Sequence, residues 1–286
     1  MLATLTSHLR EKYHPLWRLR QIPAFRRLQK ALDFTTYTAI PGTNLKVAVR
    51  FIRDSSWIWA PQALEPEIRL AFEHVLAGLK PRIFWDIGAN IGLYSWLVRQ
   101  AGSIDQVVMF EPDPTNYALI SRTLKRNAIS DCVAMNVAMA DHDGQASFLV
   151  DPASGATGTL GGTATDGISV TLHQAYGMRE TISCRTVTMD KLVAEGLAAP
   201  DFIKVDVEGA ESLVLAGGQK FLRERHPALI IEAGSDEVIK SLEEIGYAAM
   251  QIDHGNWLFI ESGQESDVFT ALKHALEARS VSVLQA

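Results

Sequence analysis

The sequence predicts an α/β fold with a mostly parallel sheet, and three observations carry that prediction. From residue 81 onward, short apolar runs alternate with segments of helical periodicity, which is typical of parallel strands joined by crossover helices. A loop containing two glycines follows the first of these runs directly. The last two runs, 247–253 and 256–262, are separated only by His254 and Gly255, which predicts an antiparallel hairpin that closes the sheet.

The elements follow in order along the chain. Residues 34–60 alternate loosely and predict one or two strands with a turn at Pro41-Gly42, and a helix is expected over about 66–79. The remaining strands of the sheet are predicted at 82–88, 106–112, 132–140, 201–207 and 227–233. The crossover helices are predicted at 91–102, 114–127, 208–225 and 235–246.

Two further strands, 144–150 and 181–188, fall outside this alternation and flank a loop rich in Gly, Ala and Thr. A long loop inside a compact domain is usually functional or mobile, and a solvent-exposed insertion without a role is the other interpretation. We expect an N-terminal extension over 1–60, a main domain over 61–263 that includes the 151–180 loop, and a C-terminal helical tail over 264–286.

Composition places the chain among soluble globular proteins. With 286 residues and 47% hydrophobic content it can bury a large core. It contains no apolar run near the roughly 18 residues needed to cross a bilayer, and its N-terminus lacks the order of a signal peptide. We therefore expect a cytoplasmic protein. Cys132 and Cys184 are expected to be reduced and buried rather than a disulfide or metal pair.

The net charge of −6 is unevenly distributed. Residues 1–33 hold seven Lys or Arg against two acidic residues, which is +5 and leaves −11 for the rest. The acidic body argues against a nucleic-acid partner. For the basic segment two interpretations stay open: peripheral contact with an anionic membrane, or short helices packed on the main domain with their charges in solvent.

The loop after the first strand of the alternating region, in FWDIGANIGLYS (84–95), predicts a ligand site. Asp86 ends the strand, and Gly88 and Gly92 leave the backbone unhindered. In open parallel sheets, ligands bind at the carboxyl ends of the strands where the strand order reverses. Glu111 ends the next strand, where a carboxylate accepts hydrogen bonds from a ribose, so the ligand is expected to contain adenosine.

A dinucleotide-binding oxidoreductase fits part of this pattern. However, Asn90 stands where the second glycine of a G-x-G-x-x-G fingerprint would stand, and that fingerprint serves a pyrophosphate. Asp86 suits a ligand with a cationic group. S-adenosylmethionine carries an amine and a sulfonium and no phosphate, so the sequence favours this methyl donor, with the oxidoreductase as the alternative.

Five motifs resemble the FkbM-type family of S-adenosylmethionine-dependent methyltransferases, over roughly residues 80–235. They are D-I-G-A-N-I-G at 86–92, E-P-D-P-T-N at 111–116, N-V-A-M-A-D-H-D-G at 136–144, T-M-D-K-L at 188–192 and F-I-K-V-D-V-E-G-A-E-S-L-V-L-A-G at 202–217. The resemblance implies the class I methyltransferase (Rossmann-like) fold, with a seven-stranded, mostly parallel sheet. It also implies methyl transfer, usually to a hydroxyl of a sugar, glycan or secondary metabolite.

Carried over by motif, the resemblance assigns a donor site. The loop after the first strand should surround the methionine part, Glu111 should hold the ribose, and the end of the third strand should border the adenine. The residues so implied are Asp86, Gly88, Ala89, Asn90, Gly92, Ser95, Glu111, Pro112, Asn136, Val137, Ala138 and Asp206.

The fourth strand should supply the catalytic groups. Two-residue alternation places Lys204 and Asp206 on one face, with Glu208 on the turn that follows. Asp206 and Glu208 are candidates for the proton acceptor and for orienting the acceptor. A divalent-metal site of Asp206 with Glu232 and His254 is a second possibility, and purely structural pairing of these charges is a third. A binding protein that retains the donor pocket without catalysis also stays open. The sequence leaves the acceptor and the oligomeric state undetermined.

Overall fold

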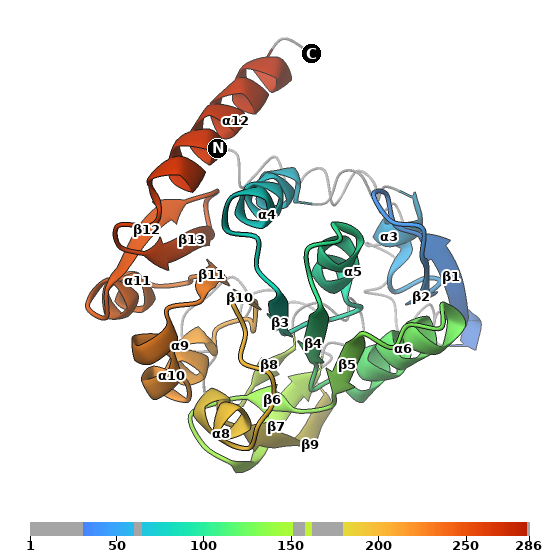
Figure 1. The fold of residues 1–286 in the computed structure, drawn as a ribbon. Helices are drawn as coiled ribbons and strands as arrows, with labels where there is room; N and C mark the ends of the chain where they lie inside the picture. The colour runs from blue at the N-terminus through green and yellow to red at the C-terminus, as the bar shows by residue number, and fades with distance from the viewer. Residues whose placement is uncertain (1–30, 60–64, 151–157, 162–179, 285–286) are drawn as a thin grey trace.

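The computed structural model describes residues 31–59, 65–150, 158–161 and 180–284, and its centre is a seven-stranded sheet (Figure 1). The strand order is β12-β13-β11-β10-β3-β4-β5, and only β13 runs antiparallel to its neighbours. The strands are β3 (Ile83–Ile87), β4 (Gln106–Phe110), β5 (Cys132–Met135), β10 (Phe202–Val205), β11 (Ala228–Glu232), β12 (Tyr247–Gln251) and β13 (Asn256–Glu261). The predicted α/β class, the mostly parallel sheet and the closing hairpin are confirmed.

Helices cover both faces of this sheet. Its strands direct alternate apolar residues to opposite faces, and each face needs a cover to bury them. Phe84, Met109 and Phe202 face one apolar cluster, whereas Trp85 and Val108 face the other. The first face is covered by α4 (Pro66–Leu79), α5 (Leu93–Gln100) and α6 (Pro114–Arg126). The second is covered by α8 (Met189–Ala194), α9 (Glu211–Ala216), α10 (Gln219–Arg225) and α11 (Asp236–Glu243).

Two predicted elements are divided in the structure. The strand predicted over 132–140 ends at Met135, because the Asn136 amide Nδ2 bonds the carbonyls of Glu111 and Pro112 at 2.8 and 3.0 Å. The helix predicted over 208–225 breaks at Gly217. A Cβ on Gly217 would lie 2.0 Å from the carbonyl oxygen of Ala140, so the backbone contact there excludes a side chain.

A second, four-stranded sheet has the order β6-β9-β7-β8 and lies beside the carboxyl end of β4 and β5 (Figure 1). Its strands are β6 (Ala138–Met139), β7 (Gly144–Val150), β8 (Thr159–Leu160) and β9 (Glu180–Val187). The two predicted strands outside the alternation are therefore present and pair with each other, antiparallel. Of the 151–180 loop, the described residues are 158–161 and 180.

The segments that flank the main domain share its core. The hairpin β1 (Thr35–Ala39) and β2 (Lys46–Arg50) precedes the short α3 (Ser55–Trp59), and Val47 packs into the first cluster. At the other end, α12 (Ser266–Leu284) lies along α4 and buries Val268 and Leu272 in the same cluster. Most of the basic segment, residues 1–30, lies outside the described residues, so its membrane interpretation stays a prediction.

No helix of the described ranges combines the length and the apolar character that a membrane span requires. Cys132 and Cys184 are buried free thiols, as predicted.

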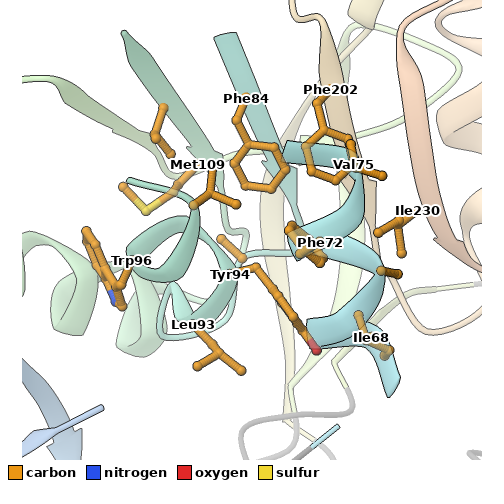
Figure 2. Packing of buried hydrophobic residues seen from close by; sticks show 14 of the residues in the cluster. Ile68, Phe72, Val75, Phe84, Leu93, Tyr94, Trp96, Met109, Phe202 and Ile230 are labelled. Atoms are coloured by element: carbon orange, nitrogen blue, oxygen red, sulfur yellow. The ribbon is translucent and has the colours of Figure 1, made fainter. Parts of the chain in front are cut away.

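An aromatic cluster fixes α4 and α5 on the sheet (Figure 2). Phe72 of α4 stacks on Tyr94 of α5, with ring centroids 4.6 Å apart and an interplanar angle of 15°. Its ring also lies 5.8 Å from Phe84 and 5.0 Å from Phe202, on two neighbouring strands. Because Phe72 is only 3% exposed, it ties two helices and two strands together.

We expect Phe72→Ala to lower the free energy of unfolding by about 3–5 kcal/mol, since it leaves a cavity between four elements. Urea unfolding followed by circular dichroism measures the change. Trp59→Ala is the matched control, because Trp59 is 72% exposed and its loss should cost no more than about 0.5 kcal/mol. Equal stability losses in the two variants would contradict the assignment.

Candidate active site

A cavity opens at the carboxyl ends of β3, β4 and β10. This is where the strand order reverses, since β4 lies on one side of β3 and β10 on the other. Eight of the predicted site residues line it: Gly88, Asn90, Glu111, Pro112, Val137, Ala138, Asp206 and Glu208. Six others do not line it: Asp86, Ala89, Gly92, Ser95, Asn136 and Lys204.

Asp86 holds the loop rather than facing the cavity. It is 1% exposed, and its Oδ2 accepts the Ser95 hydroxyl at 2.6 Å and the Ser95 N–H at 3.2 Å. Burial raises the pKa of Asp86, while the charge of Lys204 and the bonds from Ser95 oppose that shift. The two residues thus tie the end of β3 to the first turn of α5. Asp86 does not line the cavity, and its role beside the methionine part stays a prediction.

The two loop glycines are required by packing. Gly88 has φ +80°, and a Cβ there would lie 1.8 Å from the carbonyl oxygen of Asp206. Gly92 has φ +84°, and a Cβ there would lie 2.7 Å from the ring of Trp96. The sequence suggested that both glycines make room for a ligand. In the structure they also make room for the backbone after β10 and for a core indole, and Gly88 lines the cavity.

Glu111 is the best-positioned predicted ligand group. Its Oε2 accepts the Asn90 N–H at 2.7 Å, its Oε1 accepts the Asp113 N–H at 2.8 Å, and the Asn116 amide also donates to it. The side chain lines the cavity but the residue is only 4% exposed. Burial raises the pKa of Glu111 to about 8, although the N–H donors favour the ionised form.

The wall next to Glu111 is apolar and comes from both sheets. Val137 and Ala138 follow β5, as predicted for an adenine site, and Met139 extends the surface. Phe148 of β7 and Leu160 of β8 line the same cavity from the smaller sheet. Sequence reasoning missed these two residues. Alternation along 144–150 places Phe148 on one face of its strand, but nothing local indicates that this face meets the cavity.

Lys204 is a buried cation beneath the cavity. Its Nζ donates to Asp206 Oδ2 at 2.6 Å and lies 4.8 Å from the centroid of the Tyr94 ring. Burial alone would lower the pKa of Lys204, but the carboxylates of Asp206, Asp86 and Glu65 outweigh it and raise that pKa to about 12. Lys204 is therefore a fixed positive charge rather than a base, and it favours the ionised form of Asp206.

Three carboxyl groups gather beside it: Asp206 and Glu232, both of the predicted metal set, and Glu208 in place of His254. Their nearest ligand atoms all lie within 4.8 Å of one another, which would suit a divalent cation. The predicted participation of His254 is wrong for the described residues. Glu232 pairs with Asn256, the first residue of β13. His254 lies before that strand, in the hairpin turn, and outside the carboxyl cluster.

The Asp206 carboxylate raises the pKa of Glu232, with burial as the second cause and a hydrogen bond to Asp206 as the third. Because Glu232 is exposed to solvent, water moderates this shift. The direction shows that the charge of Asp206 disfavours the ionised form of Glu232.

The charge of the lining limits the kind of ligand. Among the described residues it contains four acidic side chains, Glu111, Asp113, Asp206 and Glu208, and no basic one. No basic side chain among the described lining residues would neutralise a diphosphate, whereas the carboxyl groups would stabilise a ligand that carries an amine and a sulfonium. The cavity therefore fits the predicted methyl donor better than a dinucleotide.

Comparison with known proteins agrees with this geometry. Residues 86–248, more than half of the chain, match the family model described as the methyltransferase FkbM domain. The hexuronic acid methyltransferase AglP of Haloferax volcanii is 28% identical over 69% of this chain and 77% of its own length. The 31-O-demethyl-FK506 methyltransferase FkbM of Streptomyces tacrolimicus is 30% identical over 47% of this chain, and the chain spans 58% of that relative.

A crystal structure of methyltransferase FkbM from Methylobacillus flagellatus KT matches 73% of this chain and 48% of its own, with 18% identity and a TM-score of 0.42. The fold and the site define a Rossmann-like transferase. The chain belongs to the FkbM family of methyltransferases, as the match over 86–248 shows. Membership of this family excludes the dinucleotide-binding oxidoreductase that the sequence left as the alternative.

We expect Gly88→Ala to disrupt the site, because the added methyl must push the Asp206 backbone away. Gly102→Ala is the matched control: its φ is +78°, but a Cβ there meets nothing within 4 Å. The control should lose only about 1–2 kcal/mol of stability, because alanine is strained in the left-handed backbone conformation. Gly88→Ala should lose at least about 2 kcal/mol more, from overpacking. Thermal unfolding of both variants measures the difference, and equal losses would show that the loop yields freely.

Proposed function

We propose that this protein is an S-adenosylmethionine-dependent methyltransferase that methylates a hydroxyl oxygen of a sugar, a glycan or a secondary metabolite. The observation that carries the donor assignment is the acidic, partly apolar cavity at the strand-order reversal, with Glu111 at the end of β4. The printed functions of the relatives, a hexuronic acid methyltransferase and a 31-O-demethyl-FK506 methyltransferase, support the acceptor class.

The donor would be held by groups of known chemistry. The backbone at Gly88 and Asn90 borders the methionine position, Glu111 accepts the ribose hydroxyls, and Val137 and Ala138 offer an apolar surface to the adenine. When bound, the donor supplies a methyl group on a sulfonium that is already reactive. The protein's task is therefore to align the acceptor oxygen with that methyl and to remove the hydroxyl proton.

Asp206 is the proposed proton acceptor. It lines the cavity, its side chain is 28% exposed, and Lys204 compensates its charge from below. Glu208 follows the turn after β10 and lines the same space, where it can orient an acceptor hydroxyl. Asp206 would hold the proton that it takes from the acceptor hydroxyl and release it to solvent, since its side chain is partly exposed. Lys204 acts on Asp206 by charge and does not take up the proton.

The proposal is tested directly by incubating the protein with S-adenosylmethionine and a panel of uronic acids, glycans and macrolide alcohols. Acceptor-dependent formation of S-adenosylhomocysteine and a methyl ether is the expected result. Donor binding by calorimetry without turnover on any acceptor would instead favour a protein that binds the donor without catalysis.

The pH dependence of donor binding should report on Glu111. Ribose hydroxyls donate to the ionised carboxylate, whereas its pKa of about 8 leaves most of it protonated at neutral pH in the empty cavity. Binding must then release a proton, so affinity for S-adenosylhomocysteine should rise with pH, by up to about tenfold per pH unit below that pKa. Calorimetry at about pH 6.5, 7.5 and 8.5 measures the slope around this pKa.

Glu111→Gln is the control for that slope. It keeps the shape but cannot ionise, so its affinity should be weaker and nearly independent of pH over this range. Asp113 and the carboxyl cluster remain in the variant, so any slope that persists belongs to them. A wild-type affinity that does not change between these pH values would contradict the role given to Glu111.

Asp206→Asn should lower turnover by about two orders of magnitude or more, the scale of a lost general base. Donor affinity should change by less than about tenfold, since Asp206 faces the reacting methyl rather than the adenosine. Asp105→Asn is the matched control, because Asp105 pairs with Arg82 at the opposite end of the strands and is 58% exposed. Full turnover in Asp206→Asn would make the carboxyl cluster structural.

A chelator distinguishes a mechanism in which Asp206 is the general base from one that depends on a metal ion. Lys204 already occupies Asp206 Oδ2, so we expect EDTA to leave the wild-type rate unchanged. Loss of activity that magnesium restores would instead assign Asp206, Glu208 and Glu232 to a divalent cation.

A further inference from the structure

A buried arginine outside the family match contacts Asn116, a residue that lines the cavity. Arg53 follows β2 and is 7% exposed. Its Nε and Nη2 donate to the two carboxylate oxygens of Asp54 at 2.7 and 3.1 Å. Nη2 also donates to Asn116 Oδ1 at 2.7 Å. The planar guanidinium therefore joins the N-terminal segment to the first turn of α6.

The Asn116 side chain connects Arg53 to Glu111 through a hydrogen bond at each end of its amide. It is 3% exposed and lines the cavity, and its amide donates to the Glu111 carboxylate. An amide side chain has one acceptor and one donor end. Because Oδ1 is bonded to Arg53, the Nδ2 end is the one that faces Glu111. Rotation of the amide by half a turn would place Oδ1 against the carboxylate and Nδ2 against the guanidinium, which is unfavourable at both contacts.

The charges around Arg53 support a fixed arrangement. Asp54 neutralises the guanidinium directly, and Asp113 and Asp33 add attraction from two other segments. Asp33 also accepts the backbone N–H of Arg53 at 3.1 Å. A buried group bonded on this many sides has one available geometry, so it can set the orientation of a neighbour.

We propose that Arg53 is a positioning residue for the methyl donor, which holds Asn116 in the orientation that keeps the Glu111 carboxylate directed at the ribose hydroxyls. The inference rests on the proposed function, since it takes Glu111 as the ribose-binding group. It assigns a part in donor binding to the segment before residue 86, which lies outside the family match.

The test compares two ligands on each protein by calorimetry: S-adenosylhomocysteine and its 2′,3′-dideoxy analogue. Their ratio of dissociation constants measures how much the protein gains from the ribose hydroxyls. Both ligands are measured on the same sample, so a loss of folded protein affects them equally and cancels. In the wild type we expect a ratio of roughly ten to a hundred, the value of hydrogen bonds to a charged group.

Two variants interrupt the chain of contacts at different points. Arg53→Lys keeps the charge beside Asp54, but a single ammonium does not reproduce the planar fork that reaches both Asp54 and Asn116. Asn116→Asp keeps the acceptor for Arg53 and removes the donor to Glu111. Arg50→Lys is the matched control, because Arg50 belongs to the same segment and pairs with Asp33 instead.

The ratio should fall at least about threefold in Arg53→Lys and in Asn116→Asp, and should stay at the wild-type value in Arg50→Lys. A purely structural role would weaken both ligands alike and leave the ratio unchanged, which would overturn the inference. A wild-type ratio near one is a different failure: it would show that Glu111 does not hold the ribose, whatever Arg53 does.

Discussion

The close approach of two loops, at Gly88 and the carbonyl of Asp206, is the constraint on which the site depends. A side chain at Gly88 would overlap that oxygen, so the loop after β3 and the loop after β10 lie in direct backbone contact. The first loop carries the backbone that is proposed to border the donor, and the second carries the proposed proton acceptor. The contact between the two loops sets the distance from the proposed donor position to the proposed proton acceptor. Methyl transfer requires that this distance be short and fixed.

Burial gives the carboxyl groups of this site different properties. Asp86, which lies behind the loop, is held by Ser95 and by the charge of Lys204. Glu111 is equally enclosed, and its pKa rises to about 8. Asp206 lies beside a buried ammonium, and its negative charge raises the pKa of Glu232. Carboxyl groups with different surroundings thus provide a structural anchor at Asp86 and the proposed ribose ligand and proton acceptor at Glu111 and Asp206.

The cavity is assembled from parts that are remote in the chain. The main sheet supplies the strand ends, and the smaller sheet adds Phe148 and Leu160 as an apolar wall. The segment before the family match contributes Arg53 through Asn116. The site therefore depends on segments that lie far from one another in the sequence.

Much of the fold followed from the sequence, because the signals for it are local. Alternating apolar runs predicted the parallel sheet, the short connection at His254-Gly255 predicted the hairpin, and the acidic ends of two strands predicted where Asp86 and Glu111 would lie. Motif order also indicated the family. These properties depend on residues a few positions apart, and they do not require knowledge of which segments become neighbours.

Only the tertiary structure decided which side chains meet. Glu232 lies beside Asp206, as the sequence predicted, but the register of β13 leaves His254 out of the cluster and Glu208 joins it instead. Arg53 meets Asn116 across 63 positions of the chain. The glycines of the first loop are explained by the backbone and the indole that pack on them. Each of these contacts is fixed by strand order, register and packing between distant segments, and no local pattern in the sequence encodes them.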